Sequence, residues 1–204
     1  MPSVLPTAFR FLQEEPGQPR MIVEALKTLG TQEHKGSPDN PVIVGWADEV
    51  ALRAPTAYST WAAEYVNGDE VPWCGLWMAV MAARTARGDA KRQPPNGYLA
   101  ALSWNAFGVG VLKAEAAVGD VLVFKRKGGG HVGLCVGSTA DGKYVFCLGG
   151  NQDDEVNISR FPVSNPEKQF SLYGVRRPAY VNRPNGAVVR HLKADAAAGG
   201  GSVV

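Results

Sequence analysis

The sequence has few cysteines, few histidines, little net charge and no long hydrophobic run. Its 204 residues include three cysteines and three histidines, and the formal net charge is +2. An odd number of cysteines is not the pattern of a disulfide scaffold, and so small a charge does not indicate nucleic-acid binding. No apolar stretch approaches the ~18 residues that a membrane-spanning helix needs. We therefore expect no nucleic-acid partner and no membrane insertion.

What is present is the composition of an ordinary globular domain, with 45% hydrophobic and 20% charged residues. The opening residues, Met1–Pro6, lack the charged and apolar regions of a signal peptide. We therefore expect synthesis in a bacterial cytoplasm without a Sec signal. Proline-rich sequence at the start and Pro-, Ala- and Gly-rich sequence at the end predict three parts. These are an N-terminal arm (1–19), one domain (20–180) and a C-terminal tail (181–204).

Helical signals dominate the first half of the chain. Apolar residues recur at helical spacing after Arg20, and Asn40-Pro41 supplies a cap followed by a proline, which is a strong helix start. The expected helices cover residues 20–29, 41–52, 55–67, 72–87 and 98–104.

The second half changes to strand patterns separated by glycine-rich turns. The expected strands cover residues 119–124, 131–137, 143–148, 156–161 and 172–176. Asp141-Gly142 is a hairpin turn signal between two of them. Helices followed by an antiparallel sheet predict an α+β fold in which the N-terminal helices pack on the C-terminal sheet.

Cys74 is the most informative single residue. Pro72 fits the first turn of a helix, Asp69 can cap it, and Gly88 lies where it should stop. Apolar residues cover nearly all sides of this stretch, so we expect a buried helix: Leu76, Met78, Val80 and Met81. At such a helix start the free N–H groups favour a thiolate. The alternative is a buried structural cysteine.

The hairpin around Asp141-Gly142 predicts which residues face one another. If paired residue numbers sum to about 282, Cys135 faces Cys147 and His131 faces Asn151. Side chains alternate with period two, so these four residues share one face. A histidine beside an amide is what a cysteine nucleophile needs, because the imidazole takes the proton and the amide orients the ring.

Two other roles are open to His131, a metal ligand and a packed core residue. His131 and Cys135 are four residues apart on a strand, about 13 Å, which is too far for both to bind one zinc ion. His131 could instead simply pack, although it stands between glycines where bulk is unwelcome. We expect no metal and no cofactor. Cys135 and Cys147 are expected to be core residues without a disulfide.

Four short motifs, in this order, resemble the papain-like cell-wall hydrolases. They are Pro72-Trp73-Cys74 before a buried helix, Gly119–Phe124, Gly130–Gly133 and Gly149–Gln152. The resemblance covers residues 21–178 and is nearest to the CHAP type, the cysteine- and histidine-dependent amidohydrolase/peptidases of small phage and prophage proteins. It implies a papain-like fold.

The resemblance also implies a function. Cys74 would be the nucleophile, His131 the base and Asn151 the orienting residue of a peptidoglycan hydrolase, either a stem-peptide endopeptidase or an N-acetylmuramoyl-L-alanine amidase. Trp73 and Trp104 are candidates for contact with substrate. Such an enzyme acts at the cell wall or periplasm as a phage endolysin, or is carried in a virion with tail proteins as partners.

Three alternatives stay open at this point. Some relatives use an acidic third residue, and Asp153, Asp154 and Glu155 lie close by. The same fold can serve as a non-enzymatic structural component of a phage tail or baseplate. It can also be an interbacterial amidase toxin.

Overall fold

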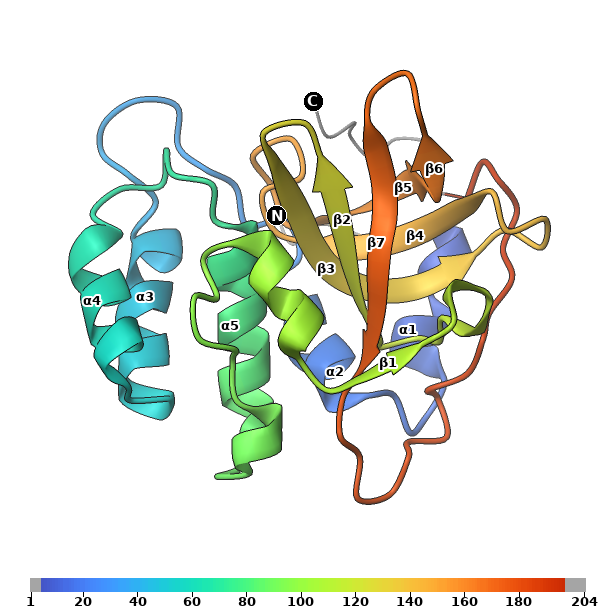
Figure 1. Cartoon of the computed structure of the whole chain (residues 1–204), viewed down its shortest axis with the longest axis horizontal. Helices are drawn as coiled ribbons and strands as arrows, with labels where there is room; N and C mark the ends of the chain where they lie inside the picture. Colours follow the sequence, from blue (N-terminus) through green and yellow to red (C-terminus); the bar gives the residue numbers. More distant parts are fainter. Residues whose placement is uncertain (1–4, 197–204) are drawn as a thin grey trace.

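The computed structural model describes residues 5–196 and shows a helical layer packed on one antiparallel sheet (Figure 1). The described α-helices are α1 (Phe11–Glu14), α2 (Arg20–Leu26), α3 (Pro41–Arg53), α4 (Ala57–Tyr65) and α5 (Cys74–Ala86). Short 3₁₀ turns are η1 (Thr7–Phe9), η2 (Ala90–Arg92), η3 (Ala101–Ala106) and η4 (Lys113–Glu115). No helix in this part of the chain is both long and apolar enough to cross a membrane.

The sheet follows the helices. Its strands are β1 (Val109–Val111), β2 (Val121–Arg126), β3 (Gly129–Ser138), β4 (Tyr144–Gly149), β5 (Asn157–Pro162), β6 (Ser164–Asn165) and β7 (Phe170–Arg177). The order is β1-β7-β2-β3-β4-β5, with β6 beside β7, and every pairing is antiparallel. The predicted α+β class, with helices packed on a C-terminal sheet, is therefore confirmed.

The helix starts show which sequence signals were correct. The Asn40 side chain accepts a hydrogen bond from the Val42 N–H, so the predicted start of α3 is confirmed. Helix α5 begins differently, because no side chain caps it. The predicted cap, Asp69, is fully buried, and its Oδ2 accepts the backbone N–H groups of His34 (3.0 Å) and Asn40 (2.7 Å). Asp69 thus ties two loops together instead of capping α5.

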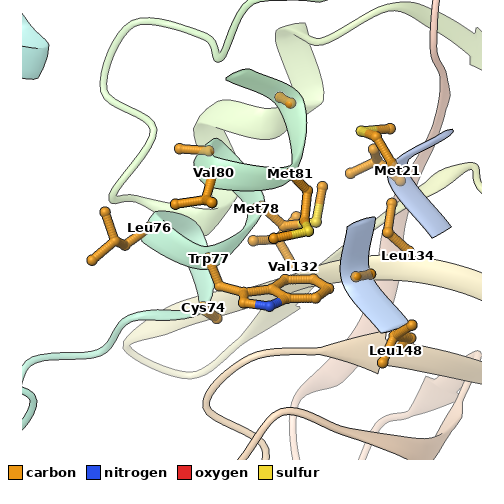
Figure 2. Close-up of a cluster of buried hydrophobic side chains, with 14 of the residues drawn as sticks. Met21, Cys74, Leu76, Trp77, Met78, Val80, Met81, Val132, Leu134 and Leu148 are labelled. Atoms are coloured by element: carbon orange, nitrogen blue, oxygen red, sulfur yellow. The ribbon is translucent and has the colours of Figure 1, made fainter. Parts of the chain in front are cut away.

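Helix α5 lies between the sheet and the outer helices α3 and α4 (Figure 1). All its residues are buried except Arg84, whose guanidinium makes a bidentate ion pair with Glu49 (2.7 and 2.8 Å). The predicted all-round burial of this helix is confirmed. Side chains of α5 share one cluster with side chains of β3 and β4 (Figure 2): Leu76, Trp77, Met78, Val80, Met81, Val132, Leu134 and Leu148.

The segment expected to be an N-terminal arm belongs to the core. Leu5, Phe9 and Leu12 are buried, and the Phe9 ring meets the Phe146 ring edge-on at 5.6 Å. The residues are spaced i, i+4 and i+7, which is one helical face. The surrounding prolines obscured this spacing.

The expected C-terminal tail is also docked, as far as residue 196. Ser138 donates its N–H to the Arg190 carbonyl and accepts the N–H of Leu192, both at 2.9 Å. The Arg190 guanidinium lies 4.1 Å from the centre of the Phe11 ring and pairs with Glu15. This segment therefore extends the sheet and joins the two ends of the chain. The glycine-rich residues 199–201 lie outside the described residues.

Candidate active site

Cys74 is the first residue of α5, and its side chain is 6% exposed. Backbone N–H groups lie close enough to its thiol to act on the thiol pKa, and the first of them is that of Val132 on β3. Figure 2 shows Cys74 at the end of the helix that faces β3. Gly75 allows this packing, because a Cβ atom there would stand 2.3 Å from the Tyr98 carbonyl oxygen. The loop at Tyr98–Leu99 therefore crosses directly over the helix start.

His131 lies next to Val132 on β3, and its side chain is 2% exposed. The Val132 N–H beside the thiol belongs to the peptide that joins these two residues, so the thiol lies against β3 next to the backbone of His131. The imidazole stacks against Phe161, with ring centres 5.4 Å apart, and against Phe124, at 6.1 Å. These aromatic contacts hold the ring from one side.

Gln152 fixes the tautomer of His131. Its Oε1 lies 3.0 Å from the imidazole Nε2. Its Nε2 donates to the carbonyls of Cys147 (3.3 Å) and Asn157 (2.8 Å), so the amide oxygen must be the atom that faces the ring. An amide oxygen only accepts hydrogen bonds, so the imidazole Nε2 carries the proton. Neutral His131 therefore has its lone pair on Nδ1, the form that a general base requires.

A second layer of hydrogen bonds holds Gln152. The Asn157 Nδ2 donates to the Gln152 carbonyl at 2.7 Å, and Asn157 Oδ1 accepts from Gln152 Nε2 at 2.9 Å. The Ser159 hydroxyl donates to the same Oδ1 at 2.8 Å. A chain of side chains thus runs from β5 to the imidazole. The sequence did not predict that Asn157 and Ser159 belong to the site, because neither residue lies in a recognisable local motif.

Asn151 does not have the predicted place beside His131. The register is as predicted at Cys135 opposite Cys147. Strand β4 then ends at Gly149, and Asn151 stands in a turn with φ of 56°. The period-two alternation stops with the strand, so the side chain that reaches the imidazole comes one residue later, from Gln152.

Glycine is required where that turn passes the imidazole. A Cβ atom at Gly149 would lie 2.7 Å from Gln152 Oε1 and 3.2 Å from His131 Nε2. The acidic alternatives, Asp153–Glu155, lie further along the turn, and the Glu155 backbone pairs with Gln32. The side chain that contacts the imidazole is therefore Gln152 and not one of these carboxylates.

Trp73 and Trp104 are core residues in this structure, which corrects their expected contact with substrate. Both are fully buried. The Trp73 indole N–H donates to Glu33 Oε2 at 3.1 Å, and that of Trp104 donates to the Tyr98 carbonyl at 3.0 Å. A fully buried indole offers little surface to a ligand, so both rings support the site from behind.

Burial sets the charge state of the resting site. It raises the pKa of the Cys74 thiol, although hydrogen bonds from backbone N–H groups and the nearby Arg126 charge act in the opposite direction. Burial also lowers the pKa of His131 to about 4, although the hydrogen bond that the ring donates to Gln152 acts in the opposite direction. The resting pair is therefore a neutral thiol and a neutral imidazole. The thiolate expected from the helix start alone is outweighed by the loss of hydration.

The other two cysteines have the character expected of core residues. Both are buried and free, and they lie opposite each other on β3 and β4. Burial raises the pKa of Cys135 to about 12 and that of Cys147 well above its usual range. Neither thiol is a nucleophile at neutral pH.

The His131 environment predicts a loss of stability in mild acid. The imidazole has a pKa of about 4 in the folded protein and an ordinary value of 6.5 when unfolded, so between these values the unfolded chain binds more protons. As the pH falls from 6.5 to 4, the free energy of unfolding should drop by about 3 kcal/mol on this account. Urea unfolding at several pH values measures it.

The matched variants are His131→Asn and, at an exposed loop position, His34→Asn. His131→Asn should remove this loss of unfolding free energy between pH 6.5 and 4. His34→Asn should show the same loss as the wild-type protein. Equal losses in all three proteins would show that His131 is not the group responsible.

The assembled site offers a thiol at a helix start, a base with a fixed tautomer and backbone N–H groups beside the sulfur. Acyl transfer through a thioester requires these three kinds of group: a nucleophile, a base and donors for the oxyanion. In sequence the chain matches no protein-family model and no curated protein, and in fold it matches no solved structure.

Proposed function

We propose that this protein is a cysteine hydrolase that cleaves an amide bond of peptidoglycan. The observation that carries the chemistry is the hydrogen bond that His131 Nε2 donates to Gln152, because it leaves the lone pair of His131 on Nδ1. His131 directly precedes Val132, whose backbone N–H lies beside the Cys74 thiol. The substrate class rests on the resemblance of four motifs to CHAP-type cell-wall hydrolases. Gln152 takes the orienting role that the resemblance gave to Asn151.

The reaction proceeds in two halves. His131 Nδ1 takes the thiol proton as the sulfur attacks the amide carbonyl, and N–H groups at the start of α5 stabilise the negative charge. The C–N bond then breaks, and the imidazolium returns its proton to the departing amine. Water, deprotonated by the same nitrogen, attacks the thioester, and the carboxylic acid and free thiol are released.

Digestion of purified peptidoglycan tests this proposal. The protein should release fragments that carry one new amine and one new carboxyl group, and mass spectrometry identifies the bond. Cleavage within the stem peptide identifies an endopeptidase, and cleavage between the lactyl group and the first alanine identifies an amidase. The absence of fragments from peptidoglycans of differing stem-peptide chemistry would contradict the proposal.

The closed site favours a second candidate, a non-enzymatic structural component of a phage particle. Cys74 is only 6% exposed and His131 only 2%, so a substrate must displace part of the covering loop. A thiol-directed activity probe separates the candidates. Labelling of Cys74 under native conditions supports the enzyme, and absence of labelling supports the structural component.

A further inference from the structure

An open groove lined by aromatic side chains runs along α4 to the start of α5. Its volume is about 330 Å³, and we call it the aromatic groove, defined by Tyr58, Trp61, Tyr65, Pro72, Trp73 and Leu99. Trp61 is 48% exposed and Tyr65 is 54% exposed. Their rings stack at 5.0 Å with an angle of 19° between planes. Exposed aromatic clusters of this kind mark binding surfaces.

The groove is held in shape by its own contacts. Tyr58 packs against Trp61 at 5.3 Å and against Tyr98 edge-on at 5.2 Å. The three aromatic residues of α4 are spaced i, i+3 and i+7, so they form one helical face. A pre-formed surface loses little entropy on binding.

The groove is continuous with the candidate active site. Pro72 and Trp73 line it and directly precede Cys74 in the chain. The Tyr98–Leu99 loop borders it and crosses Gly75 at the start of α5. In Figure 1 the end of α4 and the beginning of α5 lie at the same end of the helical layer, joined by one loop.

The chemistry of the groove distinguishes between the parts of a peptidoglycan substrate. No charged side chain lines it among the described residues. A stem peptide carries carboxylate and ammonium groups, whereas the glycan backbone is neutral. Sugar rings present C–H faces that pack on aromatic rings, and their hydroxyl and acetamido groups can hydrogen bond to the Tyr65 hydroxyl and the Trp61 N–H.

We propose that the aromatic groove binds the N-acetylated glycan of the substrate and thereby presents the attached peptide to Cys74. This inference rests on the proposed function. It moves the expected tryptophan contact with substrate from Trp73 and Trp104 to Trp61. The glycan lies along α4, and the bond to be cut lies over the start of α5.

Binding can be measured without catalysis. Cys74→Ala protein is titrated with the β-1,4-linked tetramer of N-acetylglucosamine, and binding is followed by NMR or calorimetry. We expect saturable binding that Trp61→Ala weakens by about tenfold or more and that Trp61→Phe largely preserves, because alanine removes the exposed ring on which a sugar packs and phenylalanine restores an aromatic face. Tyr173→Ala is the matched control, since Tyr173 is 51% exposed on β7, outside the groove.

The outcomes separate this inference from the proposed function. If the protein cleaves peptidoglycan but the tetramer does not bind, or binds equally to Trp61→Ala, the groove assignment is overturned and the hydrolase stands. If the tetramer binds through Trp61 but no peptidoglycan is cleaved, glycan recognition stands and the hydrolase proposal fails. If sedimentation shows dimers that Trp61→Ala dissociates, a second copy occupies the groove and the inference is wrong.

Discussion

Cys74→Ala is expected to abolish peptidoglycan hydrolysis, with a loss in turnover on the order of 10⁶, as when the nucleophile of a comparable catalytic unit is removed. The reason is that no other thiol can replace it. Cys135 and Cys147 are buried between β3 and β4, away from the start of α5, so neither has the helix-start N–H groups that lie beside the Cys74 sulfur. Fragment release from purified peptidoglycan, with thermal melting as a check on folding, measures the effect.

Cys135→Ala and Cys147→Ala are the matched controls. Each removes one buried sulfur, so each should lower the free energy of unfolding by about 1–2 kcal/mol and leave turnover nearly unchanged. An alanine variant at Cys74 that still clears cell walls at a comparable rate would rule out the thiol mechanism. A well-folded Cys147→Ala protein without activity would show that the roles are misassigned.

Gln152→Leu should lower turnover by a factor on the order of 10 to 10³, below the ~10⁴ loss seen when an orienting residue enforces the wrong tautomer. Without the amide oxygen, nothing holds the proton on His131 Nε2, so the fraction of imidazole with a free Nδ1 falls. Nitrogen NMR of the ring reports this directly, and a purely structural role would not alter it. The wild-type protein should show one tautomer and the variant a mixture.

The neighbouring residue supplies the control for this experiment. Asn151 has a φ of 56°, a conformation that glycine adopts without strain, so Asn151→Gly should leave turnover within a few-fold. Gln152→Glu should retain more activity than Gln152→Leu, because a carboxylate also accepts the Nε2 proton. A crippled Asn151→Gly beside an unaffected Gln152→Leu would restore Asn151 as the orienting residue.

Regular secondary structure was the part of the molecule that could be predicted. The buried helix behind Cys74, the α3 start at Asn40 and the Cys135–Cys147 register all follow from local periodicity and capping. The hydrogen-bond partner of His131 could not be predicted in this way. It depends on where β4 ends and how the Gly149–Gly150 turn passes the ring, and alternation carries no information beyond the last paired residue.

The burial of individual side chains was the second feature that the sequence could not predict. Local sequence places Cys74 at a helix start and indicates a lowered thiol pKa, but it cannot show that the Tyr98–Leu99 loop excludes water from that point. Trp73 and Trp104 were misjudged for the same reason. Whether an aromatic residue near a motif is exposed or buried depends on elements that are distant in the sequence. For the same reason, no local signal marks Trp61 as a residue on an open helical face.

The joining of the chain ends has a consequence for the order of folding. Arg190 pairs with Glu15 across 175 positions of sequence, and residues 188–192 supply backbone partners to Val118 and Ser138. Contacts of such long range form late, since they close the largest loops. The sheet that carries His131 therefore lacks part of its hydrogen bonding until residues 188–192 have been synthesised and have docked. The Cys74–His131 site should reach its final form at that late step.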